Sequence, residues 1–217
     1  MASEITKARI IEAAIDLFNE MGFINVRLQH ISDKTIISLG NITYHFKTKD
    51  DIINHICLKI IEEQKTLFAN HKVLPLFEDV ERFLFSYFNI QNRYPFFYQD
   101  ILELIRAFPF VKESYRKHLF WQEQQILFMF DFNISRGVFR KEPGHDFYQN
   151  YAGFFLWNMD NWMHRQLTLG YNVNDYEEFS NKIWTLLVPL FTPQGHSEYE
   201  QLQELKKLQT YELPFNN

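Results

Sequence analysis

Apolar residues recur three and four positions apart over most of the 217-residue chain. This spacing is typical of amphipathic α-helices, whereas a half-buried β-strand would show strict alternation of apolar and polar residues. In the first segment Ile10, Ala14 and Leu17 lie on one helical face, and Gly22 follows them as a stop signal. The pattern predicts an all-α protein with helices over 4–21, 26–34, 38–45, 48–70, 75–92, 95–107, 109–136, 146–169, 175–191 and 197–210.

The fourth of these ranges begins with a pattern that favours a helix start. Thr48 precedes Asp51 by three residues, so its hydroxyl and the carboxylate can each accept a hydrogen bond from an N–H group that the first helical turn leaves free. We therefore expect a long helix that opens at Thr48.

Aromatic residues are distributed unevenly along the chain. Residues 1–55 hold three Phe, one Tyr and no Trp, and the remaining 162 residues hold 20 Phe, ten Tyr and all four Trp. A small domain of ordinary composition therefore precedes a larger domain that is rich in rings. We expect the first to span 1–50 and the second 51–217.

Charge and cysteine content exclude several classes of protein. The formal net charge is −5, which argues against a protein that coats nucleic acid by charge alone. The single cysteine, Cys57, excludes an internal disulfide framework and a cysteine-rich zinc site. The N-terminus has no apolar signal segment and no apolar run approaches about 18 residues, so we expect a cytoplasmic protein outside the membrane.

Two short predicted helices, 26–34 and 38–45, follow the longer helix 4–21, and this order is typical of a helix-turn-helix unit. The second short helix must bury one face and present the other to the major groove of DNA. Ile37, Ile42 and Phe46 suit the buried face. The residues left for the groove or its rim are Ser38, Leu39, Gly40, Asn41, Thr43 and Tyr44. Four basic residues against one acidic residue give the window 27–49 a net charge of +3, which suits contact with phosphates.

Residues 4–55 resemble the DNA-binding domain of the TetR family of bacterial transcriptional regulators. The resemblance runs from Ile10 through Ala13-Ala14, Leu17-Phe18 and Gly22-Phe23, includes the recognition-helix segment 38–46 with its Tyr-His-Phe ending, and continues through Lys47-Thr48-Lys49-Asp50-Asp51. It implies that Tyr44 and Lys49 contact phosphates and that Ser38, Gly40, Asn41 and Thr43 face the groove. His45 is placed equally well as a brace of the fold or as a DNA contact.

The chain departs from the family pattern at three points. Ile36 stands in the turn where the family usually has glycine, so the turn is expected to differ slightly. Val26-Arg27 replaces a pair of hydroxyl residues, which leaves Arg27 as the candidate to replace a lost phosphate contact. Leu39 replaces a frequent polar residue and is placed to touch a thymine methyl group.

The larger domain offers a candidate ligand cavity, because family members carry a variable helical domain that dimerises and often binds an effector. Its many rings suit an ordinary core, and they also suit the walls of an apolar cavity with a few polar anchors. An acid among rings, such as Asp100, would suit a cationic ligand. The candidates for a small apolar effector are Phe97, Asp100, Ile101, Trp121, Gln125, Phe128, Phe155, Asn158 and Trp162, with His164 as a further polar anchor.

The helices about 146–169 and 175–191 resemble the pair through which family members form a homodimer. Two such helices from each subunit would make a four-helix interface around a two-fold axis. Apolar residues at helical spacing could supply this surface or pack within one subunit: Trp157, Met163, Phe179, Ile183, Trp184 and Leu187. The predicted helix 197–210 would either cover the core or extend the dimer. A membrane-surface role is disfavoured for it because of its glutamates.

An enzyme is disfavoured, because the chain lacks the helical metal-carboxylate, nucleophile-elbow and phosphate-loop motifs. We expect no cofactor and no metal ion. The sequence therefore predicts a regulator that binds operator DNA, acting as a repressor released by a small apolar effector. The alternative is a helical ligand-binding protein that has lost specific DNA binding, which the departures at Ile36 and Val26 keep open.

Overall fold

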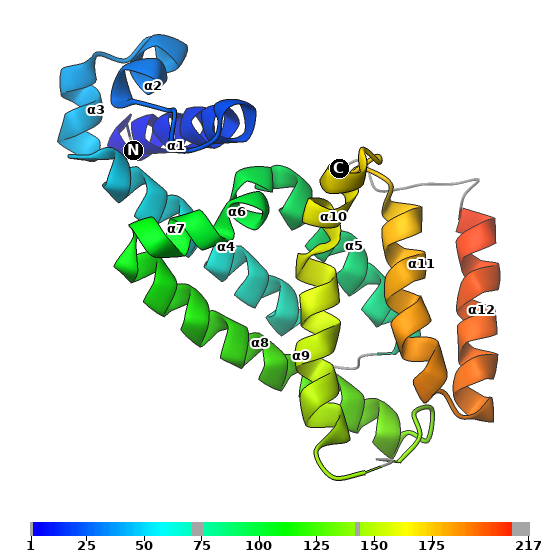
Figure 1. The fold of residues 1–217 in the computed structure, drawn as a ribbon. Coiled ribbons are helices and arrows are strands. Elements are labelled where there is room, and N and C mark those ends of the chain that lie inside the picture. The colour runs from blue at the N-terminus through cyan, green and yellow to red at the C-terminus, as the bar shows by residue number, and fades with distance from the viewer. Residues whose placement is uncertain (1, 71–75, 142–143, 210–217) are drawn as a thin grey trace. The chain divides into compact units, whose positions relative to one another are not determined.

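The computed structural model describes residues 2–70, 76–141 and 144–209. These ranges fold into helices without a β-strand, so the predicted all-α class is confirmed (Figure 1). The helices are α1 (Ala2–Met21), α2 (Leu28–Thr35), α3 (Leu39–His45), α4 (Lys49–Asn70), α5 (Phe77–Arg93), α6 (Pro95–Gln99), α7 (Ile101–Ala107), α8 (Pro109–Ser135), α9 (Phe147–Asp160), α10 (Trp162–Leu169), α11 (Tyr176–Leu187), the 3₁₀ helix η1 (Val188–Leu190) and α12 (Pro193–Gln209). None of the described helices is long and apolar enough to cross a membrane.

Two of the predicted helices are each divided in two. The range 95–107 breaks at Asp100 (φ −109°, ψ 18°), and the range 146–169 breaks at Asn161 (φ −85°, ψ 0°). Both residues have left the helical conformation for the adjoining bridge region. Asp and Asn favour such positions because their short polar side chains compete with the helical hydrogen bonds of the backbone. The prediction of two uninterrupted helices is therefore wrong at these points.

Side-chain caps fix two other helix starts. The Thr48 N–H donates to Asp51 Oδ2 at 2.9 Å and Thr48 Oγ1 accepts from the Asp51 N–H at 3.2 Å, so the predicted capping box is confirmed. At α12, Thr192 Oγ1 accepts from the Gly195 N–H at 3.2 Å. Pro193 follows this cap with the fixed φ of a first helical residue. The helix therefore begins at Pro193 rather than at residue 197.

The chain divides into two compact units whose members are not continuous in sequence. The first unit comprises residues 1–65, 90–119 and 163–171, and the second comprises 66–89, 120–162 and 172–217. The N-terminal helices thus form one compact unit together with the later segments 90–119 and 163–171. The functional division at residue 50 is a different division, and it stays a prediction.

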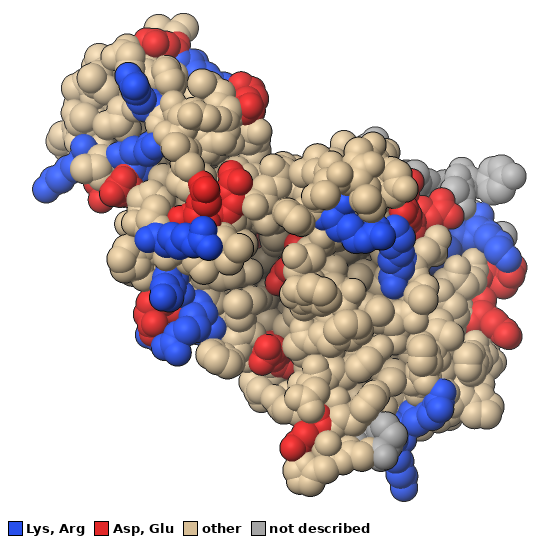
Figure 2. Space-filling model, viewed as in Figure 1, with Lys and Arg blue, Asp and Glu red and all other residues tan. Residues whose placement is uncertain are grey.

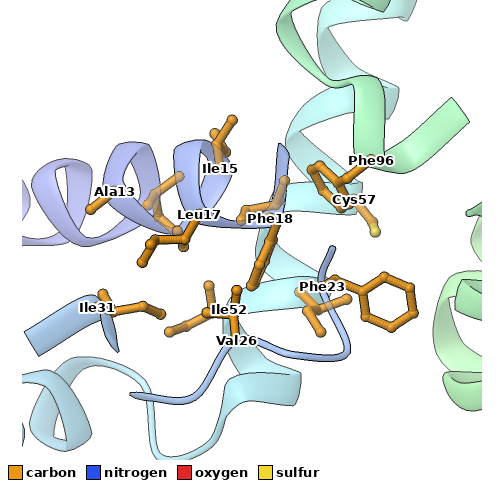
Figure 3. Close-up of a cluster of buried hydrophobic side chains, with 14 of the residues drawn as sticks. Ala13, Ile15, Leu17, Phe18, Phe23, Val26, Ile31, Ile52, Cys57 and Phe96 are labelled. Atoms are coloured by element: carbon orange, nitrogen blue, oxygen red, sulfur yellow. The ribbon is translucent and has the colours of Figure 1, made fainter. Parts of the chain in front are cut away.

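The core of the first unit joins the N-terminal helices to α6. Phe18 of α1 is fully buried, and its ring meets Phe96 of α6 edge to face with centroids 5.2 Å apart (Figure 3). Beside this pair the Asn19 side chain bonds to two backbone groups: Nδ2 donates to Arg93 O at 3.1 Å, and Oδ1 accepts from the Phe96 N–H at 3.3 Å. The corner between α5 and α6 is therefore fixed to α1 by both packing and hydrogen bonds.

The core of the second unit surrounds Trp184, which is fully buried on α11. Its indole N–H donates to Glu81 of α5, which also accepts from Tyr176 and Ser180. The ammonium of Lys206, on α12, lies 2.7 Å from Glu81 Oε1. A largely buried carboxylate with this set of partners holds α5, α11 and α12 in one arrangement.

The first testable prediction concerns Asp160, at the end of α9. Burial raises the pKa of its carboxyl to about 6, and the hydrogen bond from the Tyr87 hydroxyl lowers it in part. Because an unfolded Asp has a pKa of about 3.9, the folded chain holds this proton more tightly. The resulting stability is fully present below about pH 4 and is lost as the pH rises through 6. We expect Asp160→Asn to raise the free energy of unfolding by about 2 kcal/mol at pH 8 and to change it little at pH 4.

Urea unfolding at pH 4, 6 and 8 measures this difference. The control is Asp131→Asn, since Asp131 is exposed on α8. The account of Asp160 is wrong if its substitution changes stability equally at all three pH values.

Candidate nucleic-acid interface

Helix α3 is anchored by its apolar face. Ile42 is fully buried, and Ile37 and Phe46, which flank the helix, are 8% and 6% exposed. Ser38 caps the helix, because its Oγ accepts from the Asn41 N–H at 3.3 Å. The predicted buried face is therefore confirmed, and the helix is fixed at its start, middle and end.

The opposite face of α3 is open to solvent. Tyr44 is 81% exposed and Leu39 is 41% exposed, although both are large residues. A methyl group placed on Gly40 would meet nothing within 4 Å, so the fold does not require glycine there. Asn41 is also exposed, and Thr43 is half-buried. Five of the predicted groove residues thus lie on the solvent side of α3. At the centre of this surface, Gly40 has open space where a side chain would be.

The turn before α3 keeps a tight geometry without glycine. Ile36 ends α2 in the left-handed conformation (φ 56°, ψ 32°) with its side chain 93% exposed. Ser32 Oγ donates to Ile37 O at 2.7 Å, and an Arg9 guanidinium N–H donates to Thr35 O at 2.9 Å. A left-handed conformation costs a residue with a Cβ about 1–2 kcal/mol, so these contacts hold a strained turn in place.

The start of α2 shows what replaced the usual hydroxyl pair. Val26 is fully buried in the core, so it cannot face a phosphate. Arg27 is exposed at the N-cap position, where its backbone N–H donates to His30 Nδ1 at 3.2 Å. The guanidinium is therefore available on the surface, as its predicted role requires.

Lys49 has a structural role that the sequence did not indicate. Its Nζ donates to Phe23 O at 3.0 Å and to Ile24 O at 3.2 Å, which ties the start of α4 to the turn after α1. Burial lowers the pKa of this ammonium. In this arrangement only its remaining proton could reach a phosphate, so the predicted contact stays a prediction.

His45 and the nearby cations complete the surface. The half-buried ring of His45 lies edge to face against Tyr44, with centroids 5.2 Å apart, and so braces the exposed ring. Lys34 pairs with Asp16 at 3.2 Å and with Glu20 at 3.3 Å. Figure 2 shows basic and acidic side chains interspersed over the N-terminal helices. The interface therefore depends on a few placed groups rather than on a uniformly basic patch.

The candidate ligand residues are distributed over both units. Phe97, Asp100 and Ile101 belong to the first unit, and the other six belong to the second, so neither unit contains the whole set. Phe97 and Phe155 are fully buried and Trp162 nearly so, whereas Phe128 is 48% exposed. Within its unit Phe97 packs edge to face on Tyr115, which is ordinary core packing. Burial and the neighbouring Glu103 raise the pKa of Asp100.

Two of the polar candidates are engaged with their own helices. Gln125 Nε2 donates to Trp121 O at 3.2 Å, and Asn158 Nδ2 donates to Phe154 O at 2.7 Å. The exposed residue His164 lies on α10, in the first unit. A surface hollow of the second unit is lined by other residues: Gly144, His145, Phe147, Asn150, Tyr151 and Phe154. No signal in the sequence had singled out these six residues.

The candidate dimer residues divide by exposure. Five of them are at most 3% exposed within the single chain, which favours the alternative that they pack within one subunit: Met163, Phe179, Ile183, Trp184 and Leu187. Trp157 is 61% exposed and Phe154, one helical turn earlier, is 45% exposed. The open apolar surface of α9 is thus aromatic. On α12, Leu202 is buried, so this helix covers the core as one alternative anticipated.

Over the described ranges, no three His, Cys, Asp or Glu side chains come together as metal ligands. Cys57 is buried in α4, and burial raises the pKa of its thiol to about 12. Such a thiol is an apolar core group rather than a nucleophile.

Comparisons with known proteins agree with this geometry. Residues 10–56 match the family model of bacterial regulatory proteins, tetR family. The chain is 33% identical over 57 residues to the probable HTH-type transcriptional regulator YttP of Bacillus subtilis. The aligned stretch covers 26% of this chain and 28% of that relative.

Solved structures extend the likeness to almost the whole chain. A TetR-family transcriptional regulator from Marinobacter aquaeolei superposes with a TM-score of 0.82 at 25% identity, over 92% of this chain and 97% of that one. A gamma-butyrolactone receptor, an ArpA-like protein, shares the fold with a TM-score of 0.62 at 15% identity, over 94% and 99% of the two chains. Residues 10–56 are therefore similar to the TetR-type DNA-binding domain, and the fold of almost the whole chain is similar to that of a TetR-family regulator.

The second prediction tests the strained turn. Ile36→Gly should raise the free energy of unfolding by about 1 kcal/mol, because glycine adopts the left-handed conformation without the cost that isoleucine bears. Part of that gain is offset by the greater freedom of glycine in the unfolded chain. Urea unfolding followed by circular dichroism measures the change.

Ile24→Gly is the matched control, since Ile24 is also exposed, lies in the preceding turn and has a negative φ. It should lower stability by about 0.5–1 kcal/mol. Equal destabilisation by both substitutions would show that Ile36 is not strained.

Proposed function

We propose that the protein is a homodimeric regulator that binds operator DNA through α3 and represses transcription until a small effector releases it. The observation that carries the proposal is the two-sided character of α3. Ile42 and its flanking residues bury one face, and the other presents Leu39, Gly40 and Tyr44 to solvent. This is the arrangement that a recognition helix needs in order to enter a major groove.

The aromatic surface of α9 supports a dimer, because Phe154 and Trp157 are exposed and Phe147 and Tyr151 are half-buried beside them. The rings of Phe147, Tyr151, Phe154 and Trp157 form a series in which successive centroids lie 5.4, 5.7 and 6.3 Å apart. Aromatic surface of this kind is enriched at interfaces and rarely left in water. We infer that α9 meets its two-fold mate, with the neighbouring α11 beside it, as the predicted pair 146–169 and 175–191 anticipated.

Two subunits would present two copies of α3 to a pseudo-palindromic operator. Half-sites should lie about one helical turn of DNA, roughly 34–36 Å, or a multiple of it apart. Since bacterial DNA lies in the cytoplasm, this is the compartment in which we place the activity.

Effector release requires a ligand that prefers one of two conformations. A coupling of about 1–3 kcal/mol between effector and DNA is typical of such systems. The ring-rich second domain and the shared fold of a gamma-butyrolactone receptor support a small, largely apolar effector. We keep the nine candidate residues as the set to test, with Asp100 as the group that would favour a cationic ligand.

The rival function is a ligand-binding protein without specific DNA binding. The intact turn at Ile36 and the surface position of Arg27 favour the DNA-binding function, because the two departures that suggested the rival leave the recognition helix correctly built.

The third prediction tests whether DNA approaches α3 at Gly40. Gly40→Ala adds a methyl group that meets nothing in the free chain, so stability should stay constant or rise by about 0.5–1 kcal/mol. Binding to the segment upstream of the protein's own gene should weaken about tenfold or more, as when one base contact is lost. Fluorescence anisotropy with excess competitor DNA, over a salt series, measures the binding.

Leu102→Ala is the control, because Leu102 is exposed on α7, outside the proposed DNA and dimer surfaces, and its substitution should leave DNA binding unchanged. Unaltered affinity of Gly40→Ala for a duplex that the wild-type protein binds specifically would contradict the proposed approach.

The fourth prediction concerns the dimer. Trp157→Glu should weaken self-association about 30-fold or more, because a central aromatic residue is lost and a charge would be buried in its place. Sedimentation equilibrium measures the dissociation constant. Leu102→Glu, at a residue that is 60% exposed on α7, serves as the control. If both variants remain equally dimeric, the interface lies elsewhere.

A further inference from the structure

The exposed residues of α3 form pairs four positions apart, because residues at this spacing lie on one side of a helix. Gly40 and Tyr44 form the pair directly opposite the buried Ile42. Leu39 and Thr43 lie on one flank of this pair, and Asn41 begins the other flank. If Gly40 marks the closest approach to DNA, these two flanks are the groups that meet base edges.

The flank of Leu39 and Thr43 offers mainly apolar groups to a base. Leu39 is 41% exposed and has no polar group to offer. Thr43 Oγ1 donates to Gly40 O at 3.1 Å, so the hydroxyl proton is used within the helix. The Thr43 oxygen keeps only its capacity to accept, so the flank offers no hydrogen-bond donor. The Thr43 methyl group and the Leu39 side chain are its apolar groups, and the matching feature in the major groove is the thymine methyl group.

The flank of Asn41 carries a free amide. The Asn41 side chain is exposed and makes no hydrogen bond to the described part of the chain, whereas its backbone N–H is held by Ser38. A side-chain amide presents an N–H donor beside an acceptor oxygen in one plane, so it can donate to N7 of adenine and accept from the N6 amino group.

The two residue types that most often read guanine, Arg and Lys, are missing from the same surface. Guanine is read in the major groove chiefly by Arg or Lys, and residues 36–45 contain neither. Three nearby cations are engaged elsewhere: Arg9 with Thr35 O, Lys34 with Asp16 and Glu20, and Lys49 with two carbonyl groups. Arg27 precedes α2 and Lys47 follows α3, so neither lies on α3, and we assign both to phosphates rather than to bases.

We propose that this protein reads the core of its half-site through A·T pairs, with Leu39 and Thr43 on thymine methyl groups and Asn41 on an adenine, and without a guanine contact from residues 36–45. The inference rests on the proposed function and specifies the sequence class of its operator.

A selection from a randomised duplex library with the full-length protein gives the first test. The enriched sequences should share a two-fold repeat whose half-site core consists of A·T pairs. The bound duplex then serves for substitutions of single atoms: deoxyuridine for thymidine removes one methyl group, and 7-deazaadenine removes N7.

Variant proteins assign each effect to a residue. Deoxyuridine at one core position should weaken wild-type binding about three- to fivefold, from the burial of one methyl group, and should have no effect on Leu39→Ala. One 7-deazaadenine should cost about tenfold in the wild type and nothing in Asn41→Ala. Leu102→Ala and Asn70→Ala make the same changes at exposed sites on α7 and α4 and should keep the wild-type response. Thermal unfolding verifies that each variant is folded.

The outcomes separate the inference from the function beneath it. The inference is supported by an A·T core at which Leu39→Ala abolishes the effect of deoxyuridine and Asn41→Ala abolishes the effect of 7-deazaadenine. An enriched core built on G·C pairs, with loss of binding on 7-deazaguanine substitution, overturns it and leaves the regulator function standing. An A·T core that tolerates every deoxyuridine and 7-deazaadenine equally in all proteins also overturns it. Failure of the library to yield any enriched sequence contradicts the proposed function itself.

Discussion

The contact between α1 and the corner of α5 and α6 is the constraint on which the N-terminal unit depends. Phe18 is buried against Phe96, and Asn19 satisfies one carbonyl and one N–H of that corner. The N-terminal helices therefore do not form an isolated module, because their core continues into residues 90–119. A shift of α6 would have to carry α1 with it or break a packed and hydrogen-bonded contact.

Because α1 is fixed in this way, the surface that we propose for DNA is determined by how α3 packs on the same core. Burial of Ile42 and Phe46 sets the rotation of α3, and that rotation exposes Leu39, Gly40 and Tyr44. The strained turn at Ile36 sets the direction in which the helix leaves α2. Contacts of Arg9 and Ser32 with the turn backbone offset the strain, so position and rotation are both determined before any ligand is present.

The sequence predicted what depends on local periodicity. The buried and exposed faces of α3 follow from spacing alone, since Ile42 and Phe46 recur on the side opposite Gly40. The breaks at Asp100 and Asn161 were not predictable, because Asp and Asn also occur within uninterrupted helices and the choice depends on tertiary packing. The role of Lys49 was missed for the same reason, since its partners Phe23 and Ile24 belong to a turn distant in sequence. Trp157 and Trp184 both stand at apolar positions of a helical pattern, each on its own helix. Only the folded chain shows that Trp157 is exposed and Trp184 is buried.

Hydrogen–deuterium exchange of the full-length protein, alone and with a duplex that it binds, tests the central claim most directly. The claim is that α3 and its turn form the DNA surface on a unit that includes α6. Amides of residues 36–49 should be protected in the complex, and those of residues 94–100 should change with them, since Phe18 and Asn19 join the two segments. Protection confined to other helices, with residues 36–49 exchanging as in the free protein, would contradict the account.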